Sequence, residues 1–145
     1  RADDGALPAD AVEASAVRLL YFAGRGTNVE FRWNAEVGGW QRWQGGTPHT
    51  DANGVQLAPQ NLIVQYVDYL DTGMTDKFGE DLYEGVSVGT GPALVFTDGH
   101  MIEATWTRPS LRSVATFTDA TGNHVALTTG QTFASLVAPG GVSWE

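Results

Sequence analysis

The side chains best suited to chemistry gather in "GGTPHTDANG", residues 45–54, and just before it at Arg42. A carboxylate beside a histidine can orient and charge it, so Asp51 and His49 could form a general acid/base pair. Arg42 could hold an anion that this loop encloses. A local role is equally open. Asp51 followed by Asn53 has the composition of an Asx-turn, and His49 could donate to a backbone carbonyl.

Other candidate chemistry is weaker. His100 and His124 follow directly after expected turns, and nothing beside them has metal-ligand spacing, so we expect solvated side chains rather than zinc ligands. The acidic stretch that could bind calcium fits no EF-hand, and a solvated loop is favoured. It contains Asp71, Asp76, Glu80 and Asp81. The sequence thus predicts no metal site.

The sequence contains no motif for covalent catalysis or for phosphate binding. The chain has neither G-x-S-x-G nor S-x-x-K, and it has no cysteine. Its glycine stretches lack the helix that would complete a phosphate-binding turn, so no cofactor is expected. Trp40 and Trp43 could form a stacking platform for sugars, although large aromatics in a small β domain usually pack in its core.

Charge and composition exclude several classes of function. The chain has 145 residues, with 8 Lys+Arg against 17 Asp+Glu and a net charge of −9. Nucleic acids and anionic membrane surfaces are held mainly by basic patches, so neither is an expected partner. No apolar run approaches the roughly 18 residues of a membrane span.

The elements that must position these side chains are strands. Val29, Phe31 and Trp33 alternate with polar residues, and "WQRWQ" follows closely enough for a hairpin. "NLIVQYVDYL" is nearly all apolar and predicts a central buried strand. Asp98-Gly99 and Thr121-Gly122-Asn123 predict two further hairpins, and "TFASLVA" predicts a last strand.

Between these strands, "DTGMTDKFGEDLYEG" is expected to be a long exposed loop, and "PGGVSWE" a tail. The sum is an all-β fold, an antiparallel sandwich or barrel-like domain of about eight to ten short strands with long polar loops. We expect residues 1–15 to be a linker or arm and residues 16–145 to be one domain. Because the chain opens with Arg1 rather than Met, we expect a trimmed or processed protein or one domain of a longer one.

The order of the motifs resembles a known family. "W-x-R-W-x-G-G-T-P-H-T-D", "NLIVQYV", "VGTGPALVFTDGHMIEATWTRP" and "F-T-D-A-T-G-N-H-V-A-L-T-T-G-Q-T-F" follow one another here. This succession is similar to the C-terminal domain of the YerB-like bacterial lipoproteins, a family of unknown function. The resemblance covers residues 17–138.

The resemblance implies an extracytoplasmic protein, membrane-anchored or secreted, whose lipid-bearing cysteine lies upstream. It also implies a set of polar motif residues: Arg42, Pro48, His49, Asp51, Asn61, Trp106 and Arg108. Two positions depart from the family pattern. Arg108 stands where a lysine is frequent, which keeps the charge but changes its geometry, and Phe133 replaces the tryptophan of a closing G-x-T-W.

Three functions follow as hypotheses. The first, which we favour, is a non-catalytic envelope domain whose polar pocket binds a cell-wall fragment, an anionic ligand or an envelope protein. Its predicted ligand-binding residues are Arg42, His49, Asp51, Asn61, Trp106 and Arg108. The second is an envelope hydrolase or transferase that uses His49 and Asp51 as its acid/base pair. The third is a purely structural interaction domain.

Overall fold

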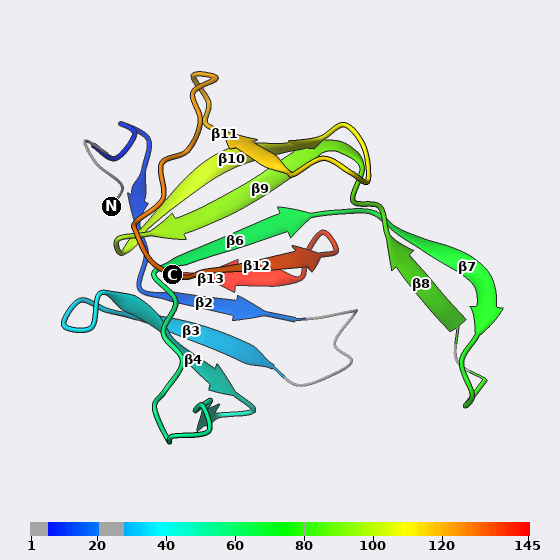
Figure 1. Ribbon diagram of the computed structural model, residues 1–145, viewed down its shortest axis with the longest axis horizontal. Coiled ribbons are helices and arrows are strands. Elements are labelled where there is room, and N and C mark those ends of the chain that lie inside the picture. The colour runs from blue at the N-terminus through cyan, green and yellow to red at the C-terminus, as the bar shows by residue number, and fades with distance from the viewer. Residues whose placement is uncertain (1–5, 21–27, 80) are drawn as a thin grey trace.

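The computed structural model describes residues 6–20, 28–79 and 81–145. These segments form thirteen strands and no helix, which confirms the all-β prediction. Several strands have only two or three residues, and these add to the eight to ten expected from the sequence. Two sheets pack face to face, and a two-stranded hairpin projects from one end (Figure 1). No described helix could span a membrane.

The upper sheet of Figure 1 has the strand order β1-β10-β9-β6-β12, with β11 paired to β10. All its pairs are antiparallel except β12 with β6, which is parallel. The predicted turn at Asp98-Gly99 joins β9 to β10, and both residues have positive φ, 49° and 70°. The strands are β1 (Val12–Glu13), β6 (Asn61–Tyr66), β9 (Gly89–Thr97), β10 (His100–Arg108), β11 (Thr116–Thr118) and β12 (Thr132–Val137).

The lower sheet has the order β13-β2-β3-β4-β5, and all its pairs are antiparallel. The predicted hairpin is present, because β3 and β4 pair along six residues each through a turn at Gly38. The strands are β2 (Ala16–Leu19), β3 (Val29–Asn34), β4 (Gly39–Gln44), β5 (Thr47–Pro48) and β13 (Val142–Trp144). The run "AVRLLYFAG", residues 16–24, has the apolar composition and length of a strand; its first four residues form β2, and its residues 21–24 lie outside the described segments.

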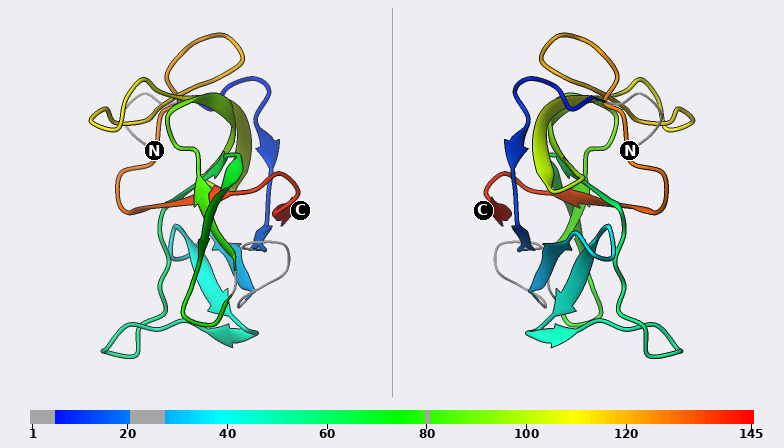
Figure 2. Two further views of the ribbon diagram at one scale, coloured as in Figure 1. Left: turned by 90° about the vertical axis from the view of Figure 1, so that its right-hand side faces the viewer. Right: turned by 90° about the vertical axis from the view of Figure 1, so that its left-hand side faces the viewer.

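The main core lies between the two sheets. Phe31 and Trp40 from the lower sheet are fully buried and face Leu62 and Phe96 from the upper sheet. The side views in Figure 2 show the two layers. A smaller cluster, centred on Ile102, covers the outer face of the upper sheet. The upper sheet runs from β1 to β12 without closing, so the fold is a sandwich rather than a barrel.

The sequence interpretation was wrong for two segments. The expected acidic loop is a hairpin, made of β7 (Tyr69–Thr75) and β8 (Asp81–Gly85), which we call the arm. Its polar composition hid the strands, because neither face of most of β7 is buried and no apolar alternation is needed. The expected tail contains β13, which pairs with β2 at the edge of the lower sheet.

Two other segments differ in part. The expected hairpin around Thr121-Gly122-Asn123 is reduced to β11 and one bridge, between Thr118 and His124. Asp119 caps its turn, because its Oδ1 accepts hydrogen bonds from the N–H groups of Thr121 and Asn123. Residues 1–15 were expected to be a linker or a free N-terminal segment. Within them, β1 pairs with β10, and Ala14 is buried in the core.

Candidate functional site

Arg42 and His49 lie side by side on the lower sheet. Arg42 on β4 pairs with Phe31 on β3, and the His49 N–H donates to the Arg42 carbonyl at 2.9 Å, one step beyond the pairing of Trp43 with Pro48. Residues that pair across antiparallel strands direct their side chains to the same face. Arg42 and His49 therefore extend from the face that carries the core, where Trp40 also lies.

The returning loop holds this arrangement from the other side. The Arg42 N–H donates to the Leu57 carbonyl at 2.8 Å, and the Gln56 amide donates to the Arg42 carbonyl at 2.8 Å. The Leu57 N–H in turn donates to the His49 carbonyl at 2.9 Å. These hydrogen bonds fix the backbone positions of Arg42 and His49 relative to each other.

The guanidinium of Arg42 rests on aromatic rings. Its Cζ lies 5.2 Å from the ring centroid of Phe133 and 5.9 Å from that of Phe31. The two rings are themselves 5.2 Å apart. Arg42 is half-buried, and among the described residues no carboxylate pairs with it and no group accepts a hydrogen bond from its side chain. Cation–π attraction to the two rings is the interaction that stabilises the guanidinium in this position.

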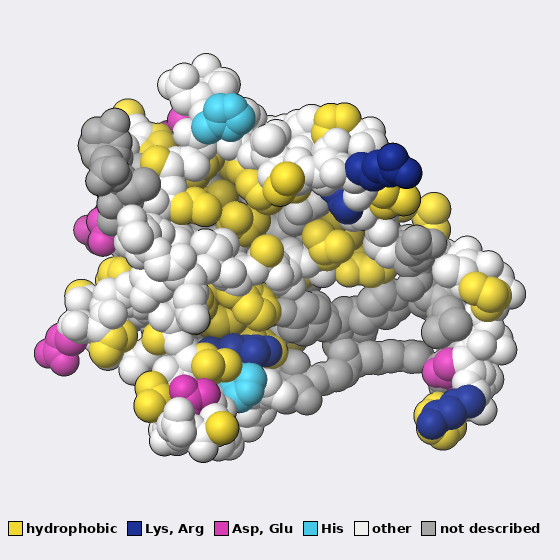
Figure 3. Space-filling view, viewed as in Figure 1, with side chains coloured by type: hydrophobic (Ala, Val, Ile, Leu, Met, Phe, Trp, Pro, Cys, Tyr) yellow, Lys and Arg dark blue, Asp and Glu magenta, His cyan; other side chains and the backbone are white. Residues whose placement is uncertain are grey.

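Unpaired buried nitrogens are concentrated in this hairpin. In the described part of the chain, every buried side-chain nitrogen or oxygen without a hydrogen-bond partner belongs to residues 40–49: Trp40 Nε1, Arg42 Nε, Trp43 Nε1 and His49 Nδ1. Native proteins leave few such groups, because each costs about 1–3 kcal/mol. Figure 3 shows a basic, a histidine and an acidic side chain gathered beside hydrophobic surface in the lower part of the molecule.

Asp51 has the local role that the sequence left open. Its Oδ1 accepts hydrogen bonds from the N–H groups of Asn53 at 2.8 Å and Val55 at 3.1 Å. This is the Asx-turn that "DANG" suggested. No hydrogen bond joins Asp51 to His49 in the structure, so the acid/base pair of the second hypothesis is not formed here.

Asn61 is fully buried at the start of β6. Its amide donates to the Thr128 carbonyl at 2.8 Å and to Thr132 Oγ1 at 3.2 Å. Its Oδ1 accepts hydrogen bonds from Thr97 Oγ1 at 2.8 Å and from the Thr128 N–H at 2.9 Å. These bonds join β6, β9 and β12, and they use the amide group inside the protein.

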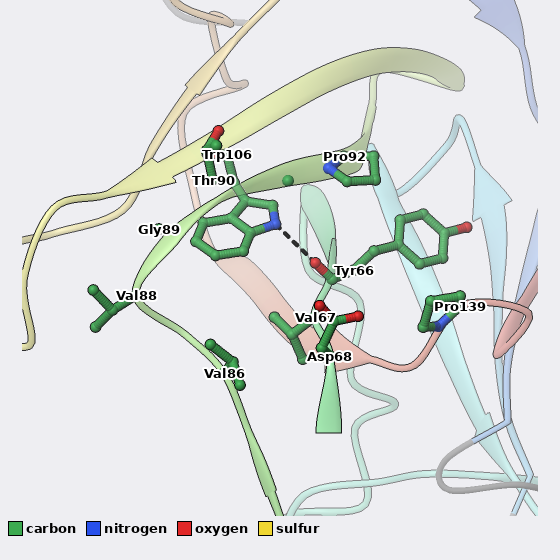
Figure 4. A pocket seen from close by; sticks show the side chains of 11 residues that line it. Tyr66, Val67, Asp68, Val86, Val88, Gly89, Thr90, Pro92, Trp106 and Pro139 are labelled. Carbon is green, nitrogen blue, oxygen red and sulfur yellow. Dashed lines mark hydrogen bonds between the residues drawn. The ribbon is translucent and has the colours of Figure 1, made fainter. Parts of the chain in front are cut away.

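Trp106 lines a cleft of about 270 Å³ at the base of the arm (Figure 4). The indole itself is only 3% exposed, and its N–H donates to the Tyr66 carbonyl at 2.8 Å. A Cβ on Gly91 would lie 2.6 Å from the indole nitrogen, so only glycine leaves room for the ring. Burial raises the pKa of the neighbouring Tyr66 phenol. Trp106 is thus a buried lining residue of the cleft, and its indole N–H is not free to bind a ligand.

Arg108 braces the loop that follows β10. Its Nε donates to the Ser113 carbonyl at 3.0 Å, Nη1 to Ser87 Oγ at 2.9 Å and Nη2 to the Leu111 carbonyl at 2.8 Å. It lies with Trp106 on β10, whereas Arg42 lies in the other sheet. The six predicted residues therefore fall into separate places, and only Arg42 and His49 present unused nitrogens together.

The remaining candidates show no cluster. His100 Nδ1 lies 2.7 Å from the Asp98 carbonyl oxygen, and His124 is exposed. Asp71 and Asp76 cap their own turns in the arm, and Glu80 lies outside the described residues. No three histidine or acidic side chains that the structure describes are placed to share a metal ion.

Comparison with known proteins identifies the family of this chain. Residues 17–134 match the model of the C-terminal domain of a protein family of unknown function, DUF3048. The chain belongs to the DUF3048 family. This DUF3048 domain resembles the crystal structure of YerB protein from Bacillus subtilis, with a TM-score of 0.76 and 20% sequence identity. The match covers 92% of this chain and 44% of that chain, so the likeness concerns the fold of less than half of YerB. No curated protein matches.

Sequence reasoning about the DUF3048 domain missed the aromatic support under Arg42. Phe31 could have been found from the β3–β4 hairpin, whose register places it opposite Arg42. Phe133 could not, because it comes from the other sheet and reaches Arg42 across the sandwich. In the sequence, Phe133 stands out only as the residue that replaces the tryptophan of the family pattern.

Proposed function

We propose that this DUF3048 domain is an extracytoplasmic, non-catalytic binding domain, and that Arg42 and His49 hold an anionic group of its ligand. One observation carries the proposal: among the described residues, the half-buried guanidinium of Arg42 has no counter-ion, and it adjoins a histidine with an unused buried nitrogen. Desolvating a charge is costly unless it is paired. A bound anion would remove that cost and satisfy both nitrogens.

The contrast with other arginines supports this assignment. Arg18 pairs with Glu145 at 2.9 Å, Arg32 pairs with Glu30 at 2.7 Å, and Arg108 donates three hydrogen bonds. Arg42 is half-buried like Arg108 and has none of these partners. A structural arginine would be expected to use its donors within the fold.

The cell-envelope location rests on the sequence resemblance to YerB-like lipoproteins. A domain tethered or secreted outside the cytoplasm meets cell-wall fragments and anionic polymers, which supply carboxylate and phosphate groups. We therefore take these as the ligand classes.

The test is a titration of the domain with soluble peptidoglycan and teichoic-acid fragments, followed by amide NMR. We expect shifts centred on residues 40–57 and on Phe133, and their loss in Arg42→Met. Arg32→Met is the matched control, because it removes the same charge from the opposite face of the sheet and should bind normally. An amide spectrum that no fragment changes would overturn the proposal.

A further inference from the structure

We infer that the group bound at Arg42 and His49 is a single carboxylate attached to an apolar body, rather than a phosphate or a polyanion. The inference rests on the proposed function and specifies its ligand. It depends on three features of the site: the donor geometry, the charge available and the aromatic support.

The donor geometry suits a carboxylate. A guanidinium offers its Nε–H and one terminal N–H as parallel donors, which match the two oxygens of a carboxylate. Among the described residues Arg42 Nε has no hydrogen-bond partner, so the first donor of this pair is unused. His49 lies beside it, and the tautomer with its proton on Nδ1 would add a third donor.

The charge available balances one negative charge. Arg42 is the cation of the site, and the described residues offer no second basic side chain hydrogen-bonded or stacked there. Arg32, on the neighbouring strand, faces away and is paired with Glu30. A phosphate dianion would leave a charge unpaired in a half-buried position. The net charge of −9 adds a long-range penalty for polyanions.

The aromatic support favours an apolar body next to the carboxylate. Phe31 is fully buried, but Phe133 is only partly buried and its ring supports the guanidinium. An apolar group bound next to the guanidinium would lie against this partly buried ring. Apolar groups that leave water there gain about 25 cal/mol per Å² of buried surface.

Three probes of similar size separate these features. Phenylacetate carries one carboxylate, phenyl phosphate carries up to two negative charges, and phenylacetamide carries none. Each is titrated into the ¹⁵N-labelled domain while the Arg42 Nε–Hε signal and the His49 ring nitrogens are followed. We expect phenylacetate to bind at least tenfold more tightly than either of the others, and acetate to bind more weakly than phenylacetate.

Variants locate the binding. Arg42→Lys keeps the charge and loses the paired donors, so phenylacetate affinity should fall about tenfold. Arg32→Met should leave it unchanged. Phe133→Leu keeps an apolar side chain in a foldable variant, and it should weaken phenylacetate more than acetate.

The outcomes are separable from those of the proposed function. Tighter binding of phenyl phosphate would overturn the carboxylate inference and leave anion binding standing. Equal binding of acetate and phenylacetate would overturn the apolar body. If envelope fragments shift Arg42 but none of the probes does, this inference fails alone. If nothing shifts Arg42, the proposed function fails with it.

Discussion

Arg42 and Arg108 are two half-buried arginines with opposite relations to the fold, and stability measurements should separate them. The Arg108 side chain donates three hydrogen bonds, whereas the Arg42 side chain donates none to the described residues. Arg108→Met should therefore lower the free energy of unfolding by about 2 kcal/mol. Arg42→Met should leave it unchanged or raise it by up to about 1 kcal/mol, because an unpaired charge leaves a half-buried site.

Urea denaturation of the two variants and the parent, in buffer without organic anions, gives both values. The m-values should stay equal if the native fold is kept. A loss of about 2 kcal/mol in Arg42→Met as well would show that its guanidinium has a structural role, contrary to the proposed function.

Asn61 is the side chain on which the junction of three strands depends. Asn61→Ala would remove the partner of the Thr128 carbonyl and the shorter of the two hydrogen bonds of the Thr128 N–H, while Thr97 Oγ1 would keep only its contacts with Thr128. Each unsatisfied group costs about 1–3 kcal/mol, so we expect a loss of about 3 kcal/mol in thermal or urea unfolding. Asn34→Ala, in the β3–β4 hairpin, is the control and should cost less than about 1 kcal/mol. Equal losses would contradict this assignment.

Asp119 should contribute to the acid sensitivity of the domain. The hydrogen bond from the Thr121 hydroxyl, followed by backbone N–H groups, lowers the pKa of Asp119 below its usual 3.8. A lowered folded-state pKa gives stability that is present above pH 3.8 and is lost as the pH falls through the folded value. Asp119→Asn keeps an acceptor oxygen but cannot titrate. Its unfolding midpoint should change less than that of the parent between pH 5 and pH 2, and identical acid profiles would refute the link.

At the scale of elements, the described residues join the arm to the body at its base. β7 and β8 pair with each other, and the Tyr69 hydroxyl donates to the Leu136 carbonyl at 3.0 Å. Leu70, Met74 and Phe78 are 60%, 61% and 78% exposed. Replacing residues 71–84 by a short turn should change the free energy of unfolding by less than about 1 kcal/mol.

The measurement is urea unfolding of the shortened chain. Tyr69→Phe, which removes the anchoring hydroxyl from the full-length arm, should cost about 1 kcal/mol and is the comparison. A large loss on shortening would mean that the arm packs on the body more than its exposed side chains indicate.

The sequence predicted those elements whose burial leaves a pattern. Alternation in "NVEFRWN" gave β3, and the Asp98-Gly99 pair gave the β9–β10 hairpin, because one face or one backbone conformation restricts the residues there. The arm and β13 were missed because backbone pairing holds them, and few of the side chains of β7 and β13 are buried. Backbone hydrogen bonds place almost no demand on residue type.

The candidate site was predictable only within one hairpin. Arg42 and His49 are near in sequence, and the pairing of β4 with β5 brings them together. Arg108 was grouped with them because the family resemblance includes all three among its polar motif residues. Their separation depends on strand order across two sheets, and no local pattern encodes that order.

At the scale of the whole molecule, the two ends of the domain are joined. β13 pairs with β2, and the Glu145 carbonyl accepts hydrogen bonds from the N–H groups of Ser15 and Ala16. Removing residues 142–145 should lower the free energy of unfolding by at least about 3 kcal/mol, because the three backbone hydrogen bonds between Glu145 and residues 15–16 alone contribute about 1 kcal/mol each. Ser143→Ala, which keeps the strand, should behave like the parent in the same unfolding experiment. A truncated chain as stable as the parent would show that β13 is dispensable.

The parallel pairing of β12 with β6 gives the order of synthesis a physical meaning. Asn61 and Thr132 are register partners, so about half of the 145-residue chain separates β6 from β12, its second neighbour. β2 and its partner β13 are separated by an even longer stretch of chain. A chain interrupted before residue 132 exposes two open strand edges, which can pair with another molecule. The domain can complete its sheets only after its last strand has left the ribosome, and a growing chain therefore benefits from being kept unfolded until then.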